Sequence, residues 1–251
     1  MPGAVAAFRL GRIDGVPVEV HIGFFVAAGL LSSCYWRSLR LSDLVLGVAL
    51  VAVLLVSVLV HEFGHAVVAR RFRVGTRLIE IDMSGGLAHL YGPAWSALED
   101  CVILLAGPLA NLLLAVVAYA VFLSLWSEPD VFLTVSDWGE LMPGLRMFVV
   151  PELLLVDVLR LFVFVNVGLC AVNLLPAFPL DGGRILFHLL SWRWGARTAT
   201  LVVGLTGVCL SLLSVLLLVG TALSGFAILL PPRFGANWKA VQHAARVHAW
   251  G

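Results

Sequence analysis

Long apolar runs separated by short polar segments dominate the pattern of the chain. A membrane-spanning helix needs about 20 apolar residues in succession, because the hydrocarbon core of a bilayer is about 30 Å thick. We expect such spans near residues 22–36, 44–70, 97–126, 155–178 and 198–222. The last uncharged run continues beyond one span. It therefore predicts a short or re-entrant segment over 223–230, followed by a tail over 231–251.

Two segments follow the period of a β-strand instead. Apolar and acidic residues alternate over 78–83, and Ser84-Gly85-Gly86 then offers a turn before a second apolar stretch. This pattern is typical of a β-hairpin, which we place at 78–91. A similar alternation over 16–21 predicts a short strand. Pro17 would suit only the edge of a sheet or the start of a strand.

The composition confines the chain to the membrane class. Hydrophobic residues make up 61% of its 251 residues, charged residues 12%, and the mean hydropathy is +1.03. A soluble domain of this size needs more polar surface. The formal charge of +1 and the lack of a basic stripe give no indication of nucleic-acid binding. We therefore expect an all-α polytopic membrane protein, with a bundle of about five or six transmembrane helices and a small β-hairpin or sheet.

Charge differs sharply between two of the polar connections. The connection after the second span begins with a basic group, whereas the connection after the third span, 127–152, is acidic. The basic residues are Arg70, Arg71, Arg73 and Arg77. The positive-inside rule places the basic connection and the hairpin in the cytoplasm. The end of the fourth span returns to the same side, so we expect a multi-pass protein of the cell membrane within the lipid bilayer.

The second span ends in His-Glu-Phe-Gly-His. His61 and His65 are four residues apart, so on a helix they lie one turn apart on one face and can hold one Zn²⁺. Glu62 can reach the open coordination position as a general base. This spacing also arises by chance in soluble chains. In a membrane segment, however, ionisable residues are costly and are usually functional, which favours a metal site.

Two imidazoles leave a catalytic zinc one protein ligand short. Asp181 is the best candidate for the third, because it ends the fourth apolar run on the side where His61 lies. Pro176 and Pro179 prevent a regular helix before it, so its carboxylate can turn toward the metal. The active site is therefore expected toward the cytoplasmic side.

Other acidic and histidine residues have different expected roles. Glu99 and Asp100 are interpreted as helix-start acids, and His188 as an interfacial or packing residue. The remaining histidines have no partner at metal-ligand spacing; they are His21, His89, His243 and His248. His89 lies in the predicted hairpin, where a role beside the substrate stays open.

The motif HEFGH together with NLLPAFPLDGGR resembles the site-2 protease family of intramembrane zinc metalloproteases. AGPLAN at 106–111 and the hairpin sequence MSGGLAH extend the resemblance. It implies that His61, His65 and Asp181 bind one Zn²⁺ per chain and that Glu62 is the catalytic base. It also implies that Asn173 holds the substrate or its tetrahedral oxyanion, unless that residue only packs helices together.

The resemblance also sets expectations for Asn111 and for the domain organisation. Asn111 is expected to pack spans together. The chain is similar to the minimal, sporulation-type branch, so we expect a single membrane-embedded domain over 1–251 without a PDZ or CBS domain.

The predicted function is hydrolysis of a peptide bond in or near a transmembrane segment of a membrane-protein substrate, in regulated intramembrane proteolysis with a separate membrane regulator. The hairpin is expected to accept the unwound substrate as an added strand. The alternative is a non-hydrolytic metal-binding membrane transporter or scaffold, which would not need a base at Glu62. Other membrane metalloproteases with this motif take a downstream glutamate as third ligand, and no glutamate follows Glu152. No nucleic-acid partner is expected.

Overall fold

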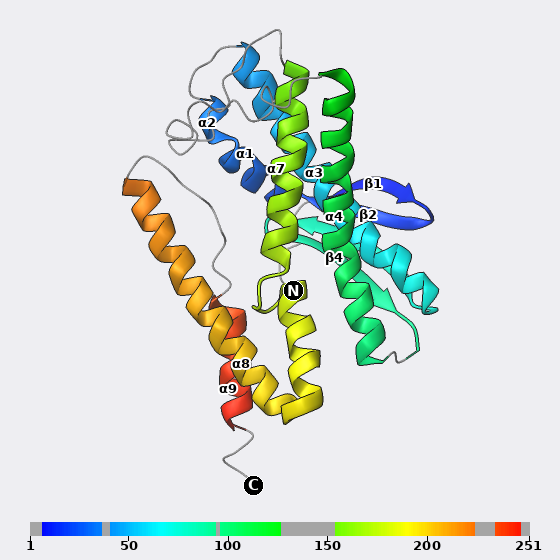
Figure 1. Ribbon diagram of the computed structural model, residues 1–251, viewed down its shortest axis with the longest axis vertical. Helices are drawn as coiled ribbons and strands as arrows, with labels where there is room; N and C mark the ends of the chain where they lie inside the picture. The colour runs from blue at the N-terminus through cyan, green and yellow to red at the C-terminus, as the bar shows by residue number, and fades with distance from the viewer. Residues whose placement is uncertain (1–6, 37–40, 94–95, 127–153, 224–233, 247–251) are drawn as a thin grey trace.

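The computed structural model describes residues 7–36, 41–93, 96–126, 154–223 and 234–246, and the account that follows is confined to them. Long helices run roughly along one axis of the molecule, and a small sheet lies against one side of them (Figure 1). This arrangement confirms the predicted class of a helical membrane protein with a small sheet. Four of the described helices are long and apolar enough to cross a bilayer: α3 (Leu41–Arg71), α4 (Ala97–Leu125), α7 (Leu154–Asn173) and α8 (Asp181–Leu223).

The first predicted span is divided into two short helices. α1 (Ile22–Leu31) and α2 (Ser33–Trp36) are separated at Ser32, whose N–H and hydroxyl both donate to the carbonyl oxygen of Ala28. With 10 residues, α1 is about 15 Å long at 1.5 Å per residue, which is half the thickness of the hydrocarbon core. It therefore packs beside the sheet and α3 without crossing the bilayer by itself.

The predicted hairpin belongs to a four-stranded sheet. β1 (Ala7–Ile13), β2 (Val16–His21), β3 (Gly75–Asp82) and β4 (Gly85–Tyr91) lie in that order. β1–β2 and β3–β4 are antiparallel hairpins, and β2 runs parallel to β3. The parallel pair is possible because α1 to α3 form the long connection that such a pair needs. The inward side chains of β2 and β3 form the core beneath α1 and α3: Val16, Val18, Val20, Ile79 and Ile81.

The spans α3, α4 and α7 pack against one another at close range. A Cβ placed on Gly64 of α3 would lie 2.6 Å from the carbonyl oxygen of Ala106 in α4. Small residues let membrane helices approach closely, and the resulting van der Waals contact stabilises the pair where water supplies no driving force. α3 and α4 thus meet on the same turns that carry the HEFGH motif.

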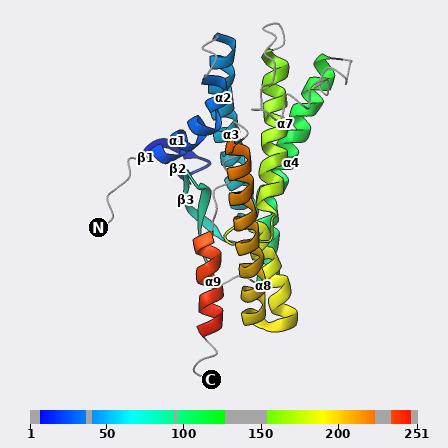
Figure 2. The ribbon, with the colours of Figure 1, turned by 90° about the vertical axis from the view of Figure 1, so that its left-hand side faces the viewer.

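Between α7 and α8 the chain leaves helical geometry, and α8 itself bends back. Gly195 in α8 has φ 79° and ψ 156°, a conformation that favours glycine. Figure 1 shows the two arms of α8 meeting in a bend at the lower end of the molecule. The predicted span 198–222 corresponds to the second arm, and α9 (Phe234–Arg246) lies beside it (Figure 2). The predicted segment 223–230 lies outside the described residues after Leu223.

Gly64→Ala is expected to lower thermal stability, because the added methyl group would overlap a backbone carbonyl that the rigid α4 helix cannot move. Overpacking of this kind costs about 1–3 kcal/mol. The measurement is the Tm of detergent-purified protein. Gly29→Ala is the matched control, since a Cβ at Gly29 in α1 would meet no atom within 4 Å. An equal Tm for both variants would contradict the close packing of α3 on α4.

Candidate metal centre

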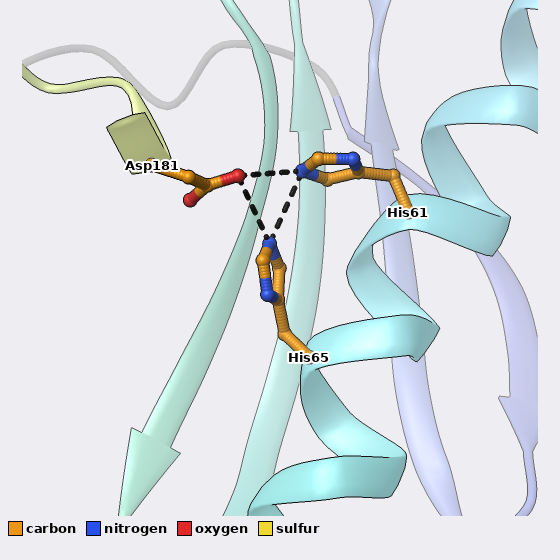
Figure 3. A group of neighbouring side chains, drawn as sticks. All are labelled: His61, His65 and Asp181. Atoms are coloured by element: carbon orange, nitrogen blue, oxygen red, sulfur yellow. Dashed lines mark hydrogen bonds and ion pairs between the residues drawn. The ribbon is translucent and has the colours of Figure 1, made fainter. Parts of the chain in front are cut away.

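Three side chains from two distant parts of the chain converge at the middle of the molecule. His61 and His65 lie one turn apart on α3, and Asp181 begins α8. The Nε2 atoms of the two histidines are 3.1 Å apart. Asp181 Oδ2 lies 3.2 Å from Nε2 of His61 and 3.5 Å from Nε2 of His65 (Figure 3). All three residues are buried. The structure thus brings together the three ligands predicted from the sequence.

Hydrogen bonds at Nδ1, the ring nitrogen that faces away from Asp181, determine which nitrogen of each histidine carries the hydrogen. His65 Nδ1 lies 2.7 Å from the carbonyl oxygen of Ile103, which can only accept. Nδ1 must therefore carry the hydrogen. In the neutral ring Nε2 then presents a bare lone pair toward Asp181.

The tautomer of His61 is fixed by a longer relay. Asn111 Nδ2 donates to the carbonyl oxygen of Ser57 and to Asn166 Oδ1. Since the carbonyl can only accept, the amide of Asn111 must point its Oδ1 at His61 Nδ1, which lies 2.6 Å away. His61 consequently donates from Nδ1 and also presents a lone pair at Nε2. Such hydrogen bonds to the far nitrogen are typical of metal-binding histidines.

This donor set fits a zinc ion. Two imidazole lone pairs and a carboxylate oxygen face one another, and Asp181 Oδ2 has no hydrogen-bond partner in the described structure. Three hydrogen-free acceptors at this separation repel one another, whereas a cation among them would be attracted to all three. Two histidines and one carboxylate also supply the three protein ligands that a catalytic zinc site uses, with one position left open.

Asp181 reaches the histidines because the chain before it folds tightly. α7 ends at Asn173, and residues 174–180 form turns before α8 begins. A Cβ on Gly182 would lie 2.1 Å from the carbonyl oxygen of Leu174, and one on Gly183 would lie 2.4 Å from that of Ala177. The glycines after Asp181 thus leave room for the turn that brings its carboxylate inward.

The side chain of Glu62 extends from α3 to the hairpin β3–β4. Glu62 is 5% exposed, and a Cβ placed on Gly86 at the start of β4 would lie 2.4 Å from its Oε1. A cavity of about 620 Å³ is lined by Glu62, both histidines, Asp181 and part of β4. The carboxylate predicted as the base therefore shares one cavity with the three convergent ligands.

Asn173 lines the same cavity, but its observed contact is local. Its Nδ2 donates to the carbonyl oxygen of Leu169 one turn earlier in α7. Its predicted contact with substrate or oxyanion stays a prediction. His89 lies 2.7 Å from Glu80 across the hairpin, in an ion pair when the ring is protonated.

The two acids at the start of α4 have different roles. Glu99 forms a capping box with Ser96, as expected of a helix-start acid. Asp100 was expected to do the same, but it is buried and accepts from Arg184 and His188 of α8 at 3.2 and 2.7 Å. It joins the start of α4 to the helix that carries Asp181. His188 packs in this cluster and not at the metal ligands.

Ser57 and Asn166 also belong to this hydrogen-bond relay and were not predicted from the sequence. Asn166 Nδ2 donates to Ser57 Oγ and to the carbonyl oxygen of Phe162, which completes the relay to His61. A buried amide inside an apolar span is costly unless it is hydrogen-bonded, so its presence in the fourth predicted span was the available signal.

Comparison with known proteins identifies the family. Residues 49–215, about two thirds of the chain, match the family described as Peptidase family M50. The chain belongs to peptidase family M50. This membership confirms the family resemblance, the metalloprotease class and the zinc cofactor predicted from the sequence.

Individual relatives agree with the family assignment. A zinc metalloprotease of Methanocaldococcus jannaschii is 30% identical over 219 residues, which cover 84% of this chain and 53% of that protein. Stage IV sporulation protein FB of Bacillus subtilis is 29% identical over 161 residues, covering 64% of this chain and 46% of the relative. The chain thus spans about half the length of these two relatives.

A solved structure extends the agreement to three dimensions. The site-2 protease from Methanocaldococcus jannaschii matches with a TM-score of 0.58 and 25% identity, over 96% of this chain and 94% of that chain. The M50 chain described here is therefore a multi-pass membrane protein with the fold of that protease.

Asn111→Leu is expected to weaken zinc binding about 10- to 100-fold, because His61 Nδ1–H would lose its acceptor and the ring its fixed orientation. Competition with a zinc-binding dye measures the affinity. Ser124→Ala on the same helix is the control, since that hydroxyl donates only to the carbonyl oxygen of Val121 in α4. Unchanged zinc affinity in Asn111→Leu would show that the relay does not position His61.

Proposed function

We propose that this chain is an intramembrane zinc metalloprotease that hydrolyses a peptide bond in or near a transmembrane segment of another membrane protein. The observation that carries the proposal is the convergence of Glu62 with His61, His65 and Asp181 in one cavity between apolar spans. Its similarity to a zinc metalloprotease and to a site-2 protease supports the same chemistry.

In the proposed mechanism His61, His65 and Asp181 hold the zinc. When bound, the ion supplies Lewis-acid polarisation of the scissile carbonyl and makes the attacking water more acidic. Glu62 takes the proton of that water and delivers it to the leaving amine. The ring orientations set by Asn111 and Ile103 keep the two Nε2 atoms aimed at one point, so the ligand geometry exists before substrate arrives.

The hairpin is proposed to hold the substrate. A helical substrate hides its carbonyls in hydrogen bonds, so the cleaved stretch must unwind. β4 lies at the edge of the described sheet, and Gly86, Leu87 and Ala88 line the cavity beside Glu62. An extended substrate added to β4 would recover the backbone hydrogen bonds that unwinding removes. Asn173, which also lines the cavity, is proposed to contact that strand or its oxyanion.

The orientation proposed for the site is toward the cytoplasm. α3 ends in Arg70 and Arg71, and Arg193 and Arg197 flank Gly195, where α8 bends. The end of α3 and the bend of α8 both lie in the lower half of the molecule in Figure 1. An excess of arginine is typical of the cytoplasmic side. Cleavage there would release the cytoplasmic part of a substrate, in regulated intramembrane proteolysis under a separate membrane regulator.

A non-hydrolytic transporter or scaffold is the competing function. It would use the same three ligands but would need no buried carboxylate beside the open position. Glu62 is buried beside Gly86, and burying a carboxylate costs free energy. A general base accounts for keeping a carboxylate at this position, which supports hydrolysis.

Glu62→Gln and Asp181→Ala are expected to separate catalysis from metal binding. Glu62→Gln should retain zinc and lose at least about 100-fold in cleavage rate, because the amide cannot accept the proton. Asp181→Ala should lose zinc as well as activity. Zinc is measured by atomic absorption and cleavage on a detergent-solubilised transmembrane peptide.

Glu99→Gln is the control for both variants. Glutamine can replace Glu99 in the capping box with Ser96, and this residue does not line the cavity. A Glu62→Gln enzyme with full activity would refute hydrolysis by this site. Full zinc content in Asp181→Ala would refute its role as a ligand.

If the substrate pairs with β4 through its backbone, the sensitivity of cleavage to N-methylation is expected to alternate from one substrate residue to the next. In an extended strand alternate N–H groups face the same neighbour. N-methylation of successive residues around the scissile bond should therefore block cleavage at every second position and be tolerated between them. The tolerated positions in the same peptide series are the control. Uniform sensitivity or uniform tolerance would contradict strand addition.

A further inference from the structure

The segment that leads to Asp181 cannot hold itself in place by regular backbone pairing. Residues 174–180 contain Pro176 and Pro179, which have no N–H to donate. Two local hydrogen bonds remain inside the segment, from the Ala177 N–H to the carbonyl oxygen of Leu175 and from the Leu180 N–H to that of Ala177. Neither involves Phe178, whose polar backbone groups are bound by another element. The position of Asp181 depends on the shape of the segment, because it follows the segment directly.

One buried side chain from the C-terminal helix binds both polar backbone groups of Phe178. The N–H of Phe178 donates to Asn237 Oδ1 at 3.0 Å, and Asn237 Nδ2 donates to the Phe178 carbonyl oxygen at 2.8 Å. The primary amide acts here as a neighbouring strand would, with one donor and one acceptor matched to one residue. Asn237 is 0% exposed, so leaving these groups unpaired would be costly.

The second arm of α8 is shaped to admit this amide. A Cβ placed on Gly207 would lie 1.9 Å from Asn237 Oδ1, and one on Gly204 would lie 2.8 Å from Val241 of α9. Arg197 Nε donates to the carbonyl oxygen of Ala244 near the end of α9, at 3.1 Å. The helix is thus held on α8 at both ends, with Asn237 aimed at the segment before Asp181.

A second anchor acts on the same segment. Thr206, which directly precedes Gly207 on α8, places its hydroxyl 2.7 Å from the carbonyl oxygen of Pro176 and 2.9 Å from that of Val203, so the shorter contact is with the segment. Thr206 therefore binds the segment at Pro176, five residues before Asp181, and Asn237 binds it at Phe178, three residues before Asp181. Asn237 also lines the cavity that holds Glu62.

We propose that Asn237 of the C-terminal helix is a positioning residue for the metal ligand Asp181, acting through the backbone of Phe178, with Thr206 as its second anchor. The inference rests on the proposed function, in which Asp181 binds zinc. It assigns to α9 a role in metal retention, although no residue of α9 belongs to the convergent ligand set.

The test uses full-length protein purified in detergent and loaded with zinc. Asn237→Leu removes the amide but keeps a side chain that branches at Cγ, and Thr206→Val replaces the hydroxyl by a methyl group. We expect faster deuterium uptake in a peptide covering 174–180 and about 10-fold faster zinc loss to a chelator in Asn237→Leu. Thr206→Val should shift both quantities in the same direction by less.

Matched controls separate positioning from general loosening. Thr200→Val removes a hydroxyl of α8 that donates only to the carbonyl oxygen of Ala196, and Val241→Ala removes packing of α9 on Gly204 while leaving the amide in place. Both should retain wild-type zinc loss and deuterium uptake at 174–180, even where Val241→Ala lowers Tm.

The outcomes distinguish the inference from the proposed function. Asp181→Ala that retains zinc would refute the ligand assignment itself. Asp181→Ala that loses zinc, together with wild-type zinc loss and exchange in Asn237→Leu, would overturn only the role of Asn237. Should Asn237→Leu fail to fold, Thr206→Val decides: wild-type behaviour in that variant overturns the proposal, and faster exchange with faster zinc loss supports it.

Discussion

The structure depends on three acceptor atoms that converge without a hydrogen between them. Each imidazole donates a hydrogen bond from Nδ1, to Asn111 Oδ1 or to the carbonyl oxygen of Ile103. Both Nε2 lone pairs therefore face Asp181 Oδ2. The three groups are buried between apolar helices, so their mutual repulsion is screened less than it would be in bulk water. Such a cluster is stable only when its surroundings hold the groups in place or when a cation joins them.

The surroundings are built from helices that meet without bulky side chains. A Cβ on Gly107 of α4 would lie 2.4 Å from His65 Nε2, and a Cβ on Gly64 of α3 would lie 2.6 Å from the carbonyl oxygen of Ala106 in α4. The close approach brings Ile103 and Asn111 of α4 within hydrogen-bonding distance of the two rings. Helix packing and ring orientation are therefore one constraint, which explains why polar and small residues occupy the same turns of α3 and α4.

Sequence reasoning reached those parts of the site that are local in the chain. The spacing of His61 and His65 fixes their common face because a helix repeats every 3.6 residues. Asp181 followed from the depth and sidedness of two spans and from the prolines before it. Asn166 and Asn237 were missed because their partners are 55 and 59 residues away, and periodicity carries no information on such pairs. β1 was missed because the alternation of Phe8, Arg9 and Leu10 stops at Gly11, where the pairing with β2 shifts register.

The metal ligands on α3 lie at some depth from the end of that helix, beside the sheet. His61 precedes Arg71 by ten residues, which is about 15 Å at 1.5 Å per residue, so the ligands lie well inside the helix end. Irregular backbone at such depth is tolerated only against protein or a wet cavity. β4 and the segment before Asp181 meet this condition in the same way, because each borders the cavity with backbone that a regular helix would have hidden. The irregular segment before Asp181 presents a metal ligand to the cavity, and β4 presents a strand edge to the same cavity. Two separate departures from helical structure therefore supply the two features that the proposed hydrolysis of an unwound membrane segment needs.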